Sequence, residues 1–262
     1  MILAHRAALN GVQLDSLDSR INIKAIEEGA GKETISAVAT AGRSGQRIQN
    51  RRRETLDVVI KFSILEPDDL AARESVLDAV KGWAAGGGVL TLNYKTGQEL
   101  DVICAQCPGS GDAYEWTTVY TITFRAYEVP YWHESSATSV TQSSASSGSL
   151  SLTAGGNTKT VAEVEFKNAS SSACNTFTVS TGEASMSFTG LALAKNETLE
   201  IDHDGKLLRI RIKDTSGVYR SAMACRSEGS SDDLYISPGA KTITYEAQRS
   251  GKFTMSVKGR FM

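Results

Sequence analysis

The sequence lacks an excess of basic residues. It has 28 Lys and Arg against 30 Asp and Glu, and the formal net charge of the 262-residue chain is −2. Proteins that bind nucleic acids mainly use a basic surface to displace counterions from phosphates. We therefore expect no direct sequence-specific binding of DNA or RNA. No apolar run approaches the roughly 20 residues that span a bilayer, so we expect no membrane segment.

The chain also lacks an export signal and the cysteine density of a disulfide-rich protein. Its start, MILAHRAALNG, is interrupted by His5 and Arg6 before an apolar core can form. We therefore expect the protein to fold in a reducing cytoplasm, where cysteines remain thiols. This expectation covers Cys104, Cys107, Cys174 and Cys225.

Recognisable catalytic and cofactor motifs are missing as well. There is no GxSxG segment, and the three histidines lie beside turns or chain ends, as surface residues usually do. The glycines at 86–88 follow a helical pattern and precede no Lys-Ser or Lys-Thr pair, so they predict a helix end and not a phosphate loop. Asp202 and Asp204 in IDHDG match half of a calcium loop, but a hairpin turn explains them better. We predict no enzyme activity, no cofactor and no metal site.

The segment CAQC, from Cys104 to Cys107, has a spacing that zinc sites and redox pairs share. A structural zinc site needs a second close pair, whereas Cys174 and Cys225 are isolated in the sequence. A redox pair usually opens a helix, but PGSGD, which follows here, is typical of a turn. We favour a strand end that carries two reduced thiols.

The first half predicts a curled β-sheet or β-barrel with one packed helix. ETLDVVIKFSI places Leu56, Val58, Ile60, Phe62 and Ile64 on one face, as expected for a strand with one buried side. EWTTVYTITFRAYEV repeats the alternation, and RINIKAI, ETISAVA, GVLTLNY and ELDVICA are shorter candidates. The one helical pattern is EPDDLAARESVLDAVKGWAAGGG, with a proline at its start, glycines at its end and one apolar stripe.

A polar, small-residue segment separates this half from a second one. Most of residues 135–148 are Ser, Thr, Ala or Gly, a composition typical of a linker. Short strands separated by Gly, Asn, Asp or Ser follow, which predicts a β-sandwich. We therefore expect a β domain with one helix over residues 1–134, a linker over 135–148, and a β-sandwich over 149–262.

Two further clusters suggest binding surfaces. The densest basic stretch is GRSGQRIQNRRRE, for which a solvated loop ahead of a strand is the default interpretation and an acidic protein partner is the alternative. Its arginines are our candidate protein-interface residues: Arg43, Arg47, Arg51, Arg52 and Arg53. Tyr127, Tyr131 and Trp132 form either a stacking platform for sugars or a plug that seals the end of the first domain.

The order of these elements resembles the distal tail proteins of long-tailed bacteriophages, over nearly the whole chain. LNGVQLDSL at 9–17 is similar to the opening of that family, ATAGRSGQ at 39–46 to one of its loops, and YEVPYW at 127–132 to the close of its first domain. FTGLALAKNETLEIDHDGK at 188–206 and YISPGAKTITYEA at 235–247 resemble strands of its sandwich domain.

The resemblance implies a structural virion protein, assembled in the bacterial cytoplasm. In such a protein the domain over 1–134 is ring-forming, with six copies in the ring, and the sandwich over 149–262 is of galectin-like type. Such a hub joins the tail tube protein to the tail-tip hub protein and, in some phages, to receptor-binding proteins. Closed rings suit this role because neighbouring copies can cover exposed strand edges. Two alternatives remain open. One is a carbohydrate-binding module in the second domain. The other is a hydrolase that uses paired carboxylates, for which Glu163 and Glu165 are the candidates.

Overall fold

The computed structural model describes residues 5–29, 32–39, 46–65, 70–109, 119–205 and 207–262. The chain divides into two compact units, Met1–Trp132 (unit 1) and His133–Met262 (unit 2). Both consist mainly of β-strands, as the sequence predicts, and α1 (Leu70–Ala85) is the one α-helix of the described residues. This helix is too short and too polar to cross a bilayer.

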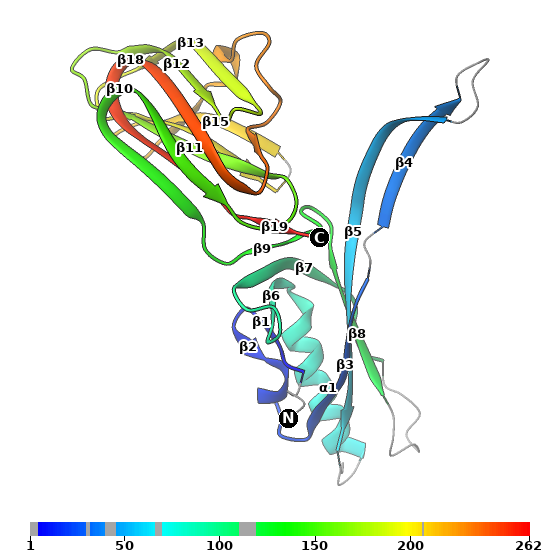
Figure 1. The fold of residues 1–262 in the computed structure, drawn as a ribbon. Coiled ribbons are helices and arrows are strands. Elements are labelled where there is room, and N and C mark those ends of the chain that lie inside the picture. Colours follow the sequence, from blue (N-terminus) through cyan, green and yellow to red (C-terminus); the bar gives the residue numbers. More distant parts are fainter. Residues whose placement is uncertain (1–4, 30–31, 40–45, 66–69, 110–118, 206) are drawn as a thin grey trace. The chain divides into compact units, whose positions relative to one another are not determined.

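Unit 1 is built on an antiparallel sheet in which hydrogen-bonded neighbours follow the order β2-β1-β6-β7-β8-β5-β3, while β4 pairs with β5 alone (Figure 1). Its strands are β1 (Ala7–Leu9), β2 (Val12–Gln13), β3 (Ile21–Glu28), β4 (Lys32–Ala39), β5 (Gln46–Ile64), β6 (Gly88–Leu92), β7 (Gln98–Gln106) and β8 (Tyr120–Ala126). A 3-10 turn, η1 (Leu14–Ser16), follows β2.

The apolar residues that alternate along β5 and β8 form part of the core of unit 1, as the sequence predicts. Every second residue of β5 from Leu56 to Ile64 is at most 5% exposed, and β8 alternates in the same way. The helix contributes its stripe: Leu77, Val80 and Ala84 are fully buried. The ring of Trp83 meets Phe124 of β8 edge-on, with centroids 5.7 Å apart.

The helix ends as its glycines predict. Gly87, with φ +61°, donates its N–H to the carbonyl of Ala84. A Cβ on Gly87 would lie 2.4 Å from the Val102 carbonyl oxygen, so only glycine fits between the helix and β7. The glycine stretch is therefore a helix stop, as expected.

One carboxylate joins an edge strand of the sheet to the turn between β6 and β7. Glu28, at the end of β3, accepts hydrogen bonds from the Tyr94 hydroxyl (3.1 Å) and the Trp132 indole N–H (2.8 Å). The Lys95 ammonium lies 3.2 Å from the same carboxylate and 4.9 Å from the Trp132 ring centroid. Because Trp132 is only 2% exposed, its ring is not available as a stacking platform.

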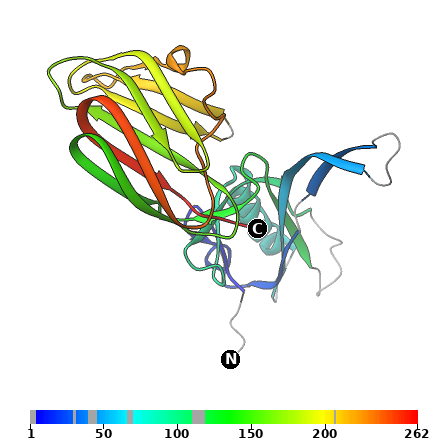
Figure 2. The same ribbon diagram turned by 45° about the horizontal axis from the view of Figure 1, so that its top comes forward.

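Unit 2 is a nine-stranded antiparallel sheet folded into two layers, with the order β13-β12-β18-β11-β14-β15-β16 and with β10 on β18 and β17 on β11 (Figure 2). The strands are β10 (Thr138–Ala154), β11 (Thr160–Asn168), β12 (Cys174–Ser180), β13 (Ser185–Leu193), β14 (Thr198–Asp204), β15 (Leu207–Lys213), β16 (Tyr219–Ser221), β17 (Tyr235–Ile236) and β18 (Gly239–Val257). Short strands β9 (Trp132–Glu134) and β19 (Arg260–Phe261) pair with each other, and η2 (Met223–Cys225) is a 3-10 turn.

The alternation in KTITYEA (241–247) and in KFTMSVKGRF (252–261) predicts two strands, but the structure has the single strand β18 over most of this range. Its first half pairs with β12 and its second half, from Gly251, pairs with β11, so β18 passes from one layer to the other. A Cβ on Gly251 would lie 2.4 Å from the Lys167 carbonyl oxygen, which explains the glycine at this bend. Strands that switch sheets through bends or bulges are a common way to close a sandwich.

The predicted linker over 135–148 is wrong for most of its length, because β10 begins at Thr138 and pairs with β18 from Thr138 to Ala154. Bulges on either side of Ala145, together with Ser144 at φ +59°, let β10 follow the bend of β18. Over 138–148 the strand is hard to recognise because its exposed face carries Ser and Thr, while its inner face carries the mixed set Val140, Gln142, Ala145 and Gly148.

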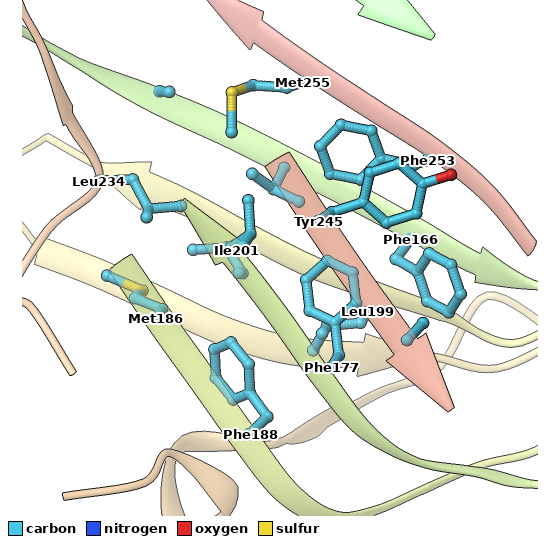
Figure 3. Close-up of a cluster of buried hydrophobic side chains, with 14 of the residues drawn as sticks. Phe166, Phe177, Met186, Phe188, Leu199, Ile201, Leu234, Tyr245, Phe253 and Met255 are labelled. Atoms are coloured by element: carbon cyan, nitrogen blue, oxygen red, sulfur yellow. The ribbon is translucent and has the colours of Figure 1, made fainter. Parts of the chain in front are cut away.

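The core of unit 2 is a group of stacked aromatic rings between the two layers (Figure 3). Phe177 of β12 lies 5.0 Å from Phe166, 6.3 Å from Phe188 and 6.4 Å from Phe253, measured between ring centroids. All four phenylalanines are at most 1% exposed.

Candidate assembly interface

The first part of β5 and the whole of β4 form a two-stranded arm that extends away from the helix and the other strands of unit 1 (Figure 1). In the arm, 32–39 pair with 46–55. β8 pairs with β5 only from Leu56 to Phe62, and β3 only from Val58 to Ile64. Among the described residues, both outer edges of the arm therefore have no neighbouring strand.

The described side chains of β4 are solvent-exposed. All side chains from Glu33 to Val38 are exposed, and the two largest apolar ones, Ile35 and Val38, are 53% and 46% exposed. An isolated two-stranded ribbon is marginally stable in water, and open strand edges readily pair with another chain. This geometry suits an element that becomes covered on assembly.

The candidate arginines lie mostly on this arm. Arg47, Arg51 and Arg52 belong to β5, opposite Val38, Ile35 and Thr34 in the register. Arg43 lies outside the described residues. The default interpretation of this stretch as a loop is wrong for 46–53, because pairing with β4 extends β5 by eight residues ahead of its alternating part. The sequence of 46–53 lacks the apolar–polar alternation from which a strand is predicted.

Arg53 stands at the base of the arm, opposite Glu33 in the register. Its guanidinium lies 5.2 Å from the centroid of the Tyr131 ring, near enough for a cation–π contact. Next to it, the Thr34 hydroxyl donates a 2.6 Å hydrogen bond to the carboxylate of Glu54. The sequence indicates the arginines but not this pairing, because the register of a strand depends on its partner segment.

Below the arm, β5 is tied to β8 by a bidentate ion pair. Arg125 donates to both carboxylate oxygens of Asp57, at 2.5 and 2.7 Å, and the two residues are direct cross-strand neighbours. The hydrogen bonds to Asp57 raise the pKa of Arg125, and the guanidinium lies 5.7 Å from the Tyr127 ring centroid. The pair fixes the strand from which the arm extends.

The carboxylates considered for catalysis lie on the outward face of unit 2. Glu163 and Glu165 line a small cavity of about 140 Å³ together with Glu200 and Asp202 of the neighbouring strand β14. Burial, followed by the charge of Asp202, raises the pKa of Glu163. Arg211 bridges Glu200 and Asp202 at 3.1 and 2.7 Å. Part of the cluster is therefore a cross-strand ion-pair ladder that connects β14 to β15.

The exposed aromatics of unit 2 do not form a stacking platform in the described part of the chain. Tyr219 has the Arg211 guanidinium 4.0 Å from its ring centroid. Tyr235 donates its hydroxyl to Asp233 at 2.9 Å, and the same carboxylate contacts the ring of His203, also at 2.9 Å. No feature here favours a glycan-binding module over a structural role.

The remaining candidates are placed as follows. All four cysteines are free thiols. His5 is exposed, but His133 and His203 are largely buried, so the expectation of three surface histidines is wrong for these two. The described residues contain no group of three or more His, Cys, Asp or Glu side chains that could hold a metal ion. Asp204 pairs directly with Leu207, as the predicted hairpin requires.

No protein-family model matches the chain, and no curated protein matches it by sequence. Solved structures match it by fold over its whole length. The SPP1 Dit (gp 19.1) protein, described as a paradigm of the hub adsorption apparatus in phages that infect Gram-positive hosts, has a TM-score of 0.62 at 10% identity, with 99% of this chain and 100% of that chain covered. A chain of the phage P2 baseplate in its activated conformation with Ca has a TM-score of 0.49 at 8% identity, with 99% and 98% covered. The chain therefore has the fold of the SPP1 Dit hub protein.

Proposed function

We propose that this chain is a structural hub protein of a bacteriophage tail, located in the virion after assembly in the host cytoplasm. The observation that carries the proposal is the end-to-end match with the SPP1 Dit fold, which includes both units and leaves neither chain with an unmatched domain. Fold alone does not define function, so the arm and its charge distribution provide the further support.

In this proposal, unit 1 forms a ring of six copies, and the β4–β5 arm of each copy docks on its neighbour. The arm offers two open strand edges and exposed apolar side chains at Ile35 and Val38. A head-to-tail contact that closes after a fixed rotation produces a ring and covers these edges. The arginines of the arm would contact acidic side chains of the neighbouring copy or of the next tail protein.

The proposed partners are the tail tube protein on one side of the ring and the tail-tip hub protein on the other, with receptor-binding proteins further out. The work is mechanical, since the ring holds its partners in register around a central opening. We propose no catalytic step, and the ion-pair ladder around Glu200 and Asp202 serves as a structural support.

The first test is the mass of the purified chain by size-exclusion chromatography with light scattering, followed by negative-stain imaging. We expect sixfold rings of about 168 kDa, six times the 28.0 kDa of one chain, either alone or after addition of tail proteins of the same phage. A particle that remains monomeric with those proteins present contradicts the hub proposal.

The role of the arm is tested separately with two variants. Ile35→Ser with Val38→Ser removes the exposed apolar surface, and Arg47→Glu with Arg51→Glu reverses charge. Both should shift the equilibrium to monomers. If the arm is a central contact, the association constant should fall by at least about tenfold, which corresponds to a loss of about 1.4 kcal/mol.

Matched control variants lie in unit 2. Val218 is 64% exposed, and Arg249 is an exposed cation on β18. Val218→Ser and Arg249→Glu should leave the rings intact. Rings that survive in the arm variants would show that the arm is not the ring contact, even where the hub role itself holds.

A further inference from the structure

Two thiols lie side by side at the end of β7. The sulfur of Cys104 is 3.2 Å from the sulfur of Cys107, close enough for an S–H hydrogen bond between them. Cys107 is exposed and Cys104 is half-buried. The other two cysteines, Cys174 and Cys225, belong to unit 2.

A regular strand would keep these sulfurs apart. Residues three positions apart in a strand are separated by about 10 Å and point to opposite faces of the sheet. In β7 the register with β8 shifts between Cys104 and Gln106, which pair with Phe124 and Thr123. The extra residue of this bulge changes the face on which the following side chain lies, and β7 ends at Gln106. The bulge therefore accounts for the approach of Cys107 to Cys104.

The surroundings of the pair favour a reaction between the sulfurs over metal binding. Two thiols supply half of a tetrahedral zinc site, and the described residues contain no larger group of metal-ligating side chains. Burial, followed by the hydrogen bond from Cys107, raises the pKa of Cys104 to about 12. In its reduced state Cys104 is therefore a neutral thiol, so no stabilised thiolate opposes its oxidation.

We propose that Cys104 and Cys107 form a reversible intrachain disulfide, a modification site at which the bulge of β7 holds both sulfurs ready for oxidation. The oxidant is a low-molecular-weight disulfide, such as glutathione disulfide. The Cys107 thiolate attacks one of its sulfurs, which forms a mixed disulfide and releases one glutathione thiolate.

Cys104 then loses its proton and attacks the Cys107 sulfur, which displaces the second glutathione thiolate. The two protein sulfurs lose two electrons in total, glutathione disulfide gains them, and the two thiol protons pass to the released glutathiones. Cys107 is the entry point because its sulfur is exposed, and Cys104 is the resolving thiol because it already lies beside it. The disulfide would fix the bulge and the end of β7.

This proposal rests on the geometry of β7 and not on the hub role, so the two can fail separately. If both hold, the pair is reduced during assembly in the cytoplasm and oxidised once the particle meets an oxidising medium.

The test uses the full chain, equilibrated in buffers of increasing glutathione disulfide to glutathione ratio and then quenched with acid. Thiol titration should fall from four thiols per chain to two. Tryptic mapping locates the bond, because residues 96–125 contain both cysteines without an internal Lys or Arg, whereas Cys174 and Cys225 lie in separate peptides. The 96–125 peptide should be lighter by two hydrogen atoms.

Cys107→Ser should keep all three of its remaining thiols free of any intrachain bond, whereas the control Cys225→Ser should form the bond as the unmodified chain does. The equilibrium constant for oxidation should be at least about tenfold larger in the native chain than in the same chain in urea, because folding pre-orients the sulfurs. An unchanged 96–125 peptide at every ratio, or equal constants in the native and unfolded chains, would overturn the proposal.

Discussion

Replacing Glu28 with Ala is expected to lower the free energy of unfolding of unit 1 by about 3 kcal/mol. The largest contribution to this loss comes from Trp132, which is almost fully buried and whose indole N–H would lose its acceptor. A buried donor left unsatisfied costs about 1–3 kcal/mol. The ion pair with Lys95, in which both side chains are about one-quarter exposed, adds at most about 1 kcal/mol.

Glu28→Gln separates the hydrogen bonds from the charge. The amide oxygen of Gln can accept from Trp132 and its NH2 group can donate to the Tyr94 hydroxyl oxygen, so only the charge interaction with Lys95 is lost. We expect a cost of about 1 kcal/mol. The neighbouring Glu27, paired with Lys61 at 2.6 Å on a more exposed surface, provides the matched control. Glu27→Ala should cost less than about 0.5 kcal/mol.

The assay is urea unfolding followed by tryptophan fluorescence. All three tryptophans precede residue 133, so the signal reports on unit 1 alone. The slope against urea should not change, because a single side chain alters little of the surface exposed on unfolding. If Glu28→Ala costs no more than Glu27→Ala, or if Glu28→Gln costs as much as Glu28→Ala, the reasoning about Trp132 is wrong.

Two other predictions concern unit 2. Phe177→Ala should destabilise the unit by about 3–5 kcal/mol, because it opens a cavity among stacked rings. Phe177→Leu should cost only about 1–1.5 kcal/mol, since the larger side chain fills most of the space. Equal losses of stability in the two variants, measured by calorimetry, would contradict this reasoning. A hydrogen bond from the Ser237 hydroxyl, followed by one from Lys241, lowers the pKa of Glu183 from 4.5 to about 2. A lowered folded-state pKa adds stability above pH 4.5 that is lost as the pH falls toward 2. Glu183→Gln should therefore flatten the acid limb of a stability–pH curve measured by circular dichroism, and an unchanged limb would refute this.

Much of the fold could be predicted from local patterns. The alternation in β5 and β8 indicates which residues meet α1, and the apolar stripe of α1 matches its buried side. These patterns are readable because one side of each element is buried and the other is exposed. The first parts of β10 and β5 escape the same procedure because neither shows a clear apolar alternation, so composition alone makes one look like a linker and the other like a loop.

The candidate interface was predictable only as a set of residues. The arginines of 43–53 are evident from the sequence, but their placement on a two-stranded arm depends on pairing with β4. Nor does the spacing of Cys104 and Cys107 reveal that their sulfurs meet, since a regular strand would hold them apart and the bulge that brings them together is defined by the partner strand β8.

The sequence by itself determined the local properties of this protein: which segments are strands, where the helix stops, which rings are buried, and that no basic surface dominates. These follow from side-chain periodicity and backbone preference, which act over a few residues. The tertiary structure decided what depends on residues far apart in the chain. It joined two predicted strands into β18, placed most of the predicted linker in a sheet and brought two thiols into contact. It also left both edges of the arm without a neighbouring strand in the part of the chain that the structure describes. The physical reason is that strand pairing is satisfied by backbone groups of distant segments, and their choice of partner leaves little trace in either segment alone.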